Sequence, residues 1–218
     1  MCFVRPAASV PAVPTREWAP SSILPGHRAG ACPSCAAFGR ELMRLLAAAP
    51  LTEITADELC RGARRPRRAL HWHTGGVRGC LRTTYATLLE RVLPSFEGPL
   101  ARDDWGRGLT AGVLAVAAHL EAEPGAARFF LVDAPAAADE TTLLLRAEAH
   151  RRLTRALAFT VIVTTPPAEA NDLQVEMLAT AIPDLLARRL LADGHLRDWR
   201  RIAAETEQLA RIFGCAPA

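Results

Sequence analysis

The sequence lacks lysine: all 26 of its basic residues, in a chain of 218, are arginine. Schiff-base chemistry and the phosphate-binding Gly-Lys-Ser/Thr loop both need a lysine amine, so the enzyme classes that use them are excluded. The chain also contains no Gly-x-Ser-x-Gly nucleophile elbow and no His-Glu-x-x-His zinc pair. A glycine-rich stretch at 106–112 lies within a helical pattern and not after a strand, so it does not indicate a dinucleotide loop. We expect a protein that is not an enzyme and has no cofactor.

Long apolar runs are missing too. No uninterrupted stretch reaches the roughly 18 apolar residues that a membrane-spanning helix needs, and prolines interrupt the first 25 residues, where a signal peptide has its apolar region. The six cysteines are spread from Cys2 to Cys215 in a chain without an export signal, which favours reduced thiols over a disulfide framework. We therefore expect a cytoplasmic protein with no membrane partner.

Cysteine and histidine are grouped in one part of the chain. Cys32 and Cys35 form a Cys-x-x-Cys pair, and four more candidate ligands follow within about forty-five residues: His71, His73, Cys60 and Cys80. A structural zinc site requires four ligands that converge. Because the chain has no second Cys-x-x-Cys pair, and because Cys60 and Cys80 fall at apolar helix positions, the sequence predicts no metal site.

Positive charge is concentrated in residues 54–94, although the whole chain carries a net charge of only +3. This segment holds eight arginines and three acidic residues, a net charge of +5, whereas residues 95–218 hold 13 arginines and 17 acidic residues, a net charge of −4. A basic segment attached to a mildly acidic remainder suits a polyanion-binding head. A solvated arginine-rich helix face gives the same charge count, so charge alone leaves both interpretations open.

Apolar residues recur at three- to four-residue spacing along most of the chain and predict an all-α fold of about nine helices. Residues 1–34 are proline-rich and aperiodic and are expected to form an arm. The helices are expected near residues 35–46, 55–62, 67–73, 81–93, 103–121, 124–131, 139–159, 173–186 and 196–213. Pro94 is expected to end the fourth helix and Pro183 to kink the eighth. The β-like run at 160–164 is interpreted as a buried connection or a distorted helix end.

Residues 35–80 have the pattern of three short helices that place one helix in the major groove of DNA. Thr55 and Glu58 predict a capping box at the start of the second helix, and Pro66 suits the first turn of the third. Several polar or aromatic side chains lie near the start of the third helix: Arg67, Arg68, His71 and Trp72. This spacing predicts a helix-turn-helix.

The same segment resembles the helix-turn-helix of the tetracycline-repressor (TetR) family of transcriptional regulators. Five residues fall without gaps on that family's N-terminal pattern: Thr55, Leu59, Ala63, Leu70 and His73. The sequence departs from the pattern at the turn, where Arg64-Arg65-Pro66 replaces Gly-Val-Ser. It departs again after the third helix, where Thr74 replaces Phe and Val77 replaces Lys. Beyond about residue 95 the likeness is one of helix pattern and size.

The resemblance implies a homodimeric regulator, expected to repress, in three parts: the arm at 1–34, a DNA-binding head at 35–80, and a ligand-binding and dimerisation domain at 81–218. The expected contacts with double-stranded operator DNA are Thr55, Arg64, Arg65, Arg67, Arg68, His71, Trp72 and Arg78. His73 is expected to make an interhelical hydrogen bond instead.

In the second half, the helical pattern predicts a cavity with these wall residues: Trp105, His119, Phe129, Phe130, His150 and Phe159. The resemblance to the TetR family implies that a small, hydrophobic effector binds there. Two wide apolar stripes close the chain and are expected to form the dimer interface through Leu178, Ile182, Leu185, Trp199, Ile202 and Leu209. Two alternatives stay open. One is a degenerate TetR-like protein without operator recognition that acts through ligand or protein binding, and the other is an all-α enzyme with a helix-bundle pocket.

Overall fold

A computed structural model of the protein describes residues 32–100, 105–137, 140–164 and 172–212. Within these ranges every regular element is helical, which confirms the all-α prediction. The elements are α1 (Pro33–Leu46), the 3-10 turn η2 (Leu51–Glu53), α2 (Ala56–Ala63), α3 (Arg67–Thr74), α4 (Val77–Leu100), α5 (Trp105–Glu121), α6 (Pro124–Arg128), the π-helical turn η3 (Phe129–Asp133), α7 (Ala134–Ala136), α8 (Glu140–Thr164), α9 (Asp172–Asp193) and α10 (Trp199–Ile212). None of the described helices is long and apolar enough to cross a membrane. The expected arm lies outside the described residues, except for its last three positions.

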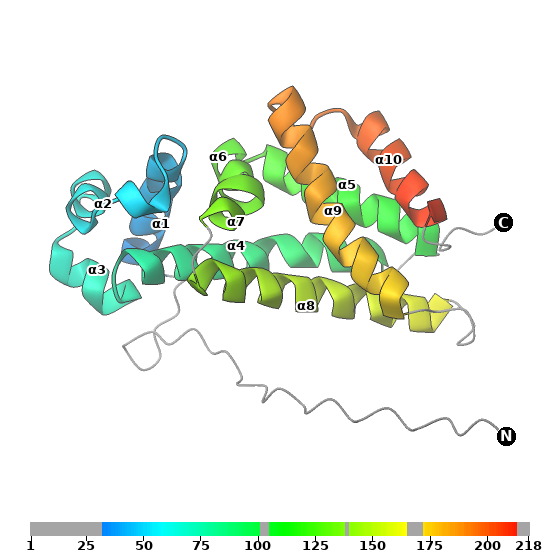
Figure 1. The fold of residues 1–218 in the computed structure, drawn as a ribbon, viewed down its shortest axis with the longest axis horizontal. Helices are drawn as coiled ribbons and strands as arrows, with labels where there is room; N and C mark the ends of the chain where they lie inside the picture. Colours follow the sequence, from blue (N-terminus) through cyan, green and yellow to red (C-terminus); the bar gives the residue numbers. More distant parts are fainter. Residues whose placement is uncertain (1–31, 101–104, 138–139, 165–171, 213–218) are drawn as a thin grey trace, which may run out of the picture.

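The first three helices pack at one end of the molecule (Figure 1). Their inward faces form an apolar cluster, called the head core below, whose most deeply buried side chains include Phe38, Leu42, Leu59 and Leu70. The three- to four-residue spacing of the sequence placed these residues on the inward faces. Phe129 of η3 and Leu145 of α8 belong to the same core. The head therefore uses side chains from well beyond the 35–80 segment that the sequence predicts.

α4 is the long helix that joins the two halves of the molecule (Figure 1). Its first half packs Leu81 and Tyr85 into the head core. Its second half packs Val92 and Phe96 into a second cluster, the body core, to which α5, α8, α9 and α10 also contribute. One continuous helix thus carries side chains of both cores.

The prediction that Pro94 ends this helix is wrong, because α4 continues through Pro94 and Pro99 to Leu100. A proline inside a helix costs about 3 kcal/mol, because it removes a backbone N–H and crowds the preceding turn. The residues beyond Pro94 compensate: Phe96 and Leu100 are each 2 % exposed. Burying such a side chain contributes about 1.5–3 kcal/mol. Packing against the body core therefore outweighs the local penalty.

The body is a bundle in which α8 lies alongside α4 and α9 crosses over them (Figure 1). α9 runs as one helix through Pro183. The backbone of the β-like run at 160–164 forms the end of helix α8, which favours the interpretation as a helix end over that as a buried connection. The expected helix at 124–131 is divided into α6 and the first part of the π-helical turn η3, after which α7 follows.

Candidate functional site

The start of α2 is held by the predicted capping box. The Thr55 backbone N–H donates to Glu58 Oε2 at 3.0 Å, and the Glu58 N–H donates to Thr55 Oγ1 at 3.2 Å. The Thr55 hydroxyl also donates to Glu58 Oε2, at 2.7 Å. These hydrogen bonds from Thr55 hold the pKa of the Glu58 carboxyl below its usual range. The Thr55 hydroxyl is thus engaged within the chain, and its predicted phosphate contact requires that the capping box open.

The turn between α2 and α3 is formed without the glycine of the TetR pattern. Arg64 occupies the left-handed region at φ 52° and ψ 46°, and the Arg65 N–H donates to the Cys60 carbonyl at 3.0 Å. Left-handed backbone costs a non-glycine residue about 1–2 kcal/mol. Pro66 is the N-cap of α3 and makes no side-chain cap hydrogen bond. The turn therefore keeps the geometry of a helix C-cap while presenting two arginines.

All eight predicted DNA-contacting residues are exposed. Trp72 shows 56 % of its surface, an unusual exposure for a tryptophan. Arg67 lies 3.4 Å from Asp57, but both side chains are more than two-thirds exposed, so this ion pair is weak. Arg64, Arg65 and Arg68 form no ion pair with any residue that the structure describes. The α2–α3 unit thus presents a basic surface on which Arg64, Arg65 and Arg68 have no carboxylate partner among the described residues.

The junction of α3 and α4 is tightly packed. Gly75 ends α3 in the left-handed region at φ 75°. A Cβ atom on Gly79 would lie 1.6 Å from the Thr74 carbonyl oxygen, so only glycine fits there. Thr74, which replaces the Phe of the TetR pattern, is buried, and its hydroxyl donates to the Leu70 carbonyl at 2.8 Å. The departure at Thr74 is accommodated without an unpaired polar group.

The His73 side chain reaches from α3 to the start of α1, which is the interhelical contact that the sequence predicted. Its Nδ1 atom lies 3.4 Å from Cys32 Sγ, and Cys35 Sγ lies 4.0 Å from its carbonyl oxygen. Burial raises the pKa of the Cys35 thiol to about 12. Cys60 and Cys80 are buried in the head core at the apolar positions expected for them. The structure thus brings one histidine and two cysteines together, a grouping that the sequence analysis did not predict.

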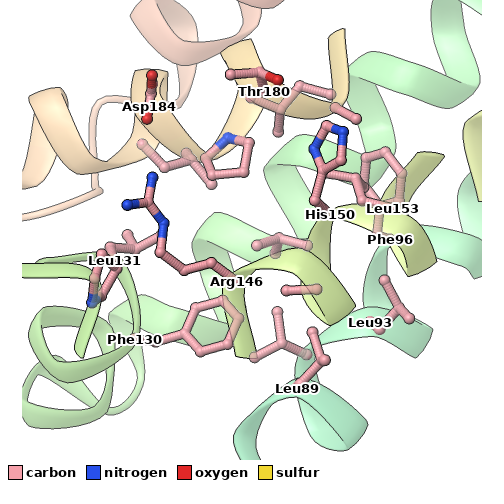
Figure 2. A pocket seen from close by; sticks show the side chains of 18 of the residues that line it. Leu89, Leu93, Phe96, Phe130, Leu131, Arg146, His150, Leu153, Thr180 and Asp184 are labelled. Atoms are coloured by element: carbon pink, nitrogen blue, oxygen red, sulfur yellow. The ribbon is translucent and has the colours of Figure 1, made fainter. Parts of the chain in front are cut away.

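A cavity of about 190 Å³ lies where α4, α8, α9 and η3 meet (Figure 2). Its walls are mainly apolar and include Leu89, Leu93, Phe96, Leu131 and Leu153. Two of the six predicted wall residues, Phe130 and His150, line it. The other placements differ. Trp105 packs in the body core and Phe129 in the head core, while His119 is not a wall residue of this cavity. The Phe159 side chain lies outside the described residues.

The polar groups of the cavity wall are few. Figure 2 shows Arg146 and Asp184 on one side and His150 on the other. The imidazole Nε2 of His150 lies 2.5 Å from the Glu176 carboxylate, which fixes the ring. Arg146 forms no ion pair with any described residue. An apolar cavity with a few polar groups is the usual form of a small-molecule site.

Tyr85 connects this cavity with the head core. Its side chain belongs to the head core and also lines the cavity. Its ring stacks on Phe130 at a centroid distance of 4.8 Å and contacts Phe129 at 6.5 Å. Burial raises the pKa of the Tyr85 hydroxyl to about 12, so the residue stays neutral at physiological pH. The sequence analysis missed this residue because its spacing marked it only as an inward position of a helix.

Most of the predicted dimer-interface residues are buried inside the single chain. Four belong to the body core: Leu178, Ile182, Leu185 and Ile202. Leu209 packs against that core, and Trp199 is exposed. In the single chain, the wide apolar stripes therefore pack mainly into the body core. The large apolar side chains that α9 exposes are different ones: Leu173, Met177 and Leu191.

The sequence matches no protein-family model and no curated protein. Solved structures do match the fold. The fatty acid degradation regulator FadR from Bacillus halodurans superimposes with a TM-score of 0.66 at 12% identity, over 82% of this chain and 94% of that one. AlkX from Dietzia sp., a TetR family repressor implicated in biodegradation of n-alkanes, superimposes with a TM-score of 0.52 at 15% identity, over 83% of this chain and 96% of that one. The helical head and body described above therefore form a TetR-like fold.

Proposed function

We propose that the protein is a transcriptional regulator that binds double-stranded DNA through its α2–α3 unit and is controlled by a small, mainly apolar ligand in the cavity. The observation that carries this proposal is the basic surface of that unit. Arg64, Arg65 and Arg68 are exposed, lie on one turn and the helix after it, and have no carboxylate partner among the described residues. Guanidinium groups bind phosphates and guanine edges in bidentate geometry.

The ligand that fits the cavity is largely apolar with one acidic group. The wall offers leucine and phenylalanine side chains over most of its surface, which favours a hydrocarbon portion. Arg146 offers a cation that forms no ion pair with a described residue, which favours a carboxylate at one end of the ligand. Asp184 is on the same side of the cavity and restricts where the acidic group can lie. The neighbours FadR and AlkX are described as regulators of fatty acid and alkane degradation, which supports an apolar ligand here.

Ligand control is proposed to pass through Tyr85 and Phe130. The stacked rings lie at the boundary between the cavity and the head core, so a ligand that moves Phe130 also acts on Tyr85. α4 carries Tyr85 and packs against α1 and α3. A ligand can shift this arrangement only if it binds more tightly when α4 is in one position than when α4 is in another.

A homodimer is proposed to form through the exposed face of α9. Met177 and Leu191 are exposed there and line a shallow groove with Ala181 and Ala187. Asp184 and Arg188 lie in the same groove, so two copies related by a two-fold axis can pair opposite charges. Two heads held by such a dimer would read two half-sites of a palindromic operator. Repression is the expected outcome, since a bound dimer blocks access to its DNA site.

Selection of binding sequences from a random duplex library tests the DNA assignment. The experiment uses the whole protein at near-physiological salt, where non-specific attraction to phosphates is weak. We expect enrichment of a palindromic sequence. The double variant Arg67→Ala with Arg68→Ala should weaken binding to that sequence by about 100-fold or more, because each lost bidentate contact is worth about 1–3 kcal/mol.

A matched control removes the same charge elsewhere. Arg155 of α8 and Arg200 of α10 are exposed and form no ion pair with described residues. The Arg155→Ala with Arg200→Ala variant should therefore bind the selected sequence as the unmodified protein does. If no sequence is enriched, or if both double variants lose binding equally, the α2–α3 unit does not read DNA. The protein would then be the TetR-like ligand or protein binder without operator recognition.

A further inference from the structure

We propose that Cys32, Cys35 and His73 form a binding site for a thiophilic divalent cation of the zinc class. Two elements supply the ligands. Cys32 is the N-cap of α1 and Cys35 lies in its first turn, while His73 lies in the last turn of α3. The two Sγ atoms and a ring nitrogen of His73 all lie within 4.8 Å of one another. This site is independent of the DNA and ligand sites proposed above.

The separations suit a tetrahedral ion. Zinc bonds to thiolate sulfur are about 2.3 Å long and those to imidazole nitrogen about 2.0–2.1 Å, which places tetrahedral sulfur and nitrogen ligands about 3.6 Å apart and two sulfurs about 3.8 Å apart. Cys32 Sγ and His73 Nδ1 are 3.4 Å apart. The three ligand atoms can therefore surround an ion through small side-chain adjustments, without rearrangement of α1 or α3.

The local sequence explains why the three residues meet. Two cysteines three residues apart lie on one face of a helix, so the first turn of α1 directs both toward the same neighbour. That neighbour is the end of α3, where Gly75 stops the helix directly after His73 and Thr74. Cys35 is buried, whereas Cys32 and His73 are partly exposed. An ion can thus enter from solvent, and three protein ligands leave the fourth position for water or an external ligand.

The donor set indicates the class of metal. Two thiolates with one imidazole favour zinc and other borderline-soft or soft ions over magnesium or calcium, which prefer oxygen. The sequence analysis counted Cys60 and Cys80 among the possible ligands and rejected the site because four ligands did not converge. Those two cysteines are buried in the head core, and three of the four remaining candidates, Cys32, Cys35 and His73, converge without them.

A bound ion would connect the start of α1 directly to the end of α3. α3 also carries Arg67 and Arg68, so the ion would fix the helix that presents the proposed DNA contacts. Any effect of the metal on operator binding rests on the proposed function. The binding of the metal itself does not.

Cobalt(II) titration of the reduced, full-length protein tests the site. Cobalt bound to thiolate gives a charge-transfer absorption in the near ultraviolet that cobalt bound to imidazole or carboxylate does not give. We expect that band to saturate at one equivalent per chain and to disappear when zinc is added in competition. Amide hydrogen exchange in α3 should slow when zinc is bound, because the ion restrains the end of that helix.

Cys32→Ser and His73→Gln are the test variants, and His71→Gln is the matched control on the same helix. Serine is a preferred N-cap residue, so Cys32→Ser removes a ligand while keeping α1 capped. We expect both test variants to lose the charge-transfer band or to bind zinc more than about 100-fold more weakly, because even second-shell changes weaken metal sites by 10–100-fold. The His71 side chain is exposed and outside the cluster, so the His71→Gln variant should bind cobalt and zinc as the unmodified protein does.

Two results would overturn the proposal. One is the absence of a charge-transfer band in the fully reduced, folded protein. The other is cobalt binding by Cys32→Ser that equals binding by the unmodified protein. Neither result bears on the library selection, which needs no metal, so failure of the metal site and failure of DNA binding can be told apart.

Discussion

In the head, the buried Thr74 hydroxyl has a hydrogen-bond acceptor, whereas in the body several buried polar atoms have no hydrogen-bond partner in the part of the chain that the structure describes. Among the described residues these atoms are Trp105 Nε1, Thr110 Oγ1, Asp133 Oδ2 and Thr154 Oγ1. The body also contains the cavity. A fully packed and hydrogen-bonded region holds one arrangement, while unfilled volume and unpaired groups leave room for another. The difference suits a head of constant shape on a body that adapts to a ligand.

The largest difference in stability between the head and the body is expected from substitutions at two adjacent phenylalanines. Phe129 is fully buried in the head core, and Phe130 lines the cavity. Phe129→Ala should lower the free energy of unfolding by about 3–5 kcal/mol. Phe130→Ala should lower it by about half as much, because the truncation enlarges a space that is already present. Urea unfolding followed by circular dichroism measures both, and equal losses would contradict the difference in packing.

A smaller effect, of opposite sign in the two regions, is expected at two threonines. Thr74→Val removes a hydroxyl that donates to the Leu70 carbonyl and should lower the free energy of unfolding by about 1 kcal/mol. Thr154→Val removes a buried hydroxyl without a partner and should raise it by about 1 kcal/mol. The same unfolding measurement compares the pair. Destabilisation by Thr154→Val would show that the body hydroxyl is satisfied in solution, for example by a buried water.

The smallest effects concern pH. The pKa of Glu58 is lowered by hydrogen bonds from Thr55, so its stabilising contribution is present above its ordinary pKa and is lost as pH falls through the lower, folded value. The pKa of Asp133 is raised by burial, so its contribution has the opposite sign: a penalty at neutral pH that is relieved as pH falls through the raised, folded value.

Two conservative variants separate these pH effects. Glu58→Gln should reduce the loss of stability on acidification. Asp133→Asn should remove the gain in stability that protonation of Asp133 gives as pH falls. The measurement is the free energy of unfolding between about pH 3 and pH 7, a range that brackets the ordinary carboxyl pKa values. Identical pH profiles for the two variants would show that the head and body carboxyls do not differ.

Local rules predicted the α2–α3 unit of the head better than they predicted the packing of the body. The capping box at Thr55, the glycine stop at Gly75 and the exposure of the arginines follow from backbone geometry and helix periodicity, which a single sequence displays. Helix periodicity also marks Leu178 and Ile182 as apolar, but it does not say whether the partner is another helix of the same chain or a second copy. In the single chain these residues pack in the body core, and the homodimer itself stays a prediction.

Contacts between distant segments were the other limit. Pro94 predicts a helix end on local grounds, and only the burial of Phe96 in a core built from other helices shows why α4 continues. Likewise, Tyr85 gains its place in the cavity wall from η3, more than forty residues later. The meeting of Cys32, Cys35 and His73 depends on the packing of α1 against α3. Spacing along the chain contains none of this information.

The sharing of the head core between distant segments affects how such proteins can be recombined. Ala126, Phe129, Ala134 and Leu145 complete a core whose other buried members all lie within residues 32–100. Residues 32–100 are therefore not an independent module, since their excision would expose the apolar surfaces that these side chains cover. A chimera that joins this head to another sensor body must supply an equally good replacement for Phe129. Divergence of the body in evolution is limited by the same contact, so the head and the body cannot change independently of each other.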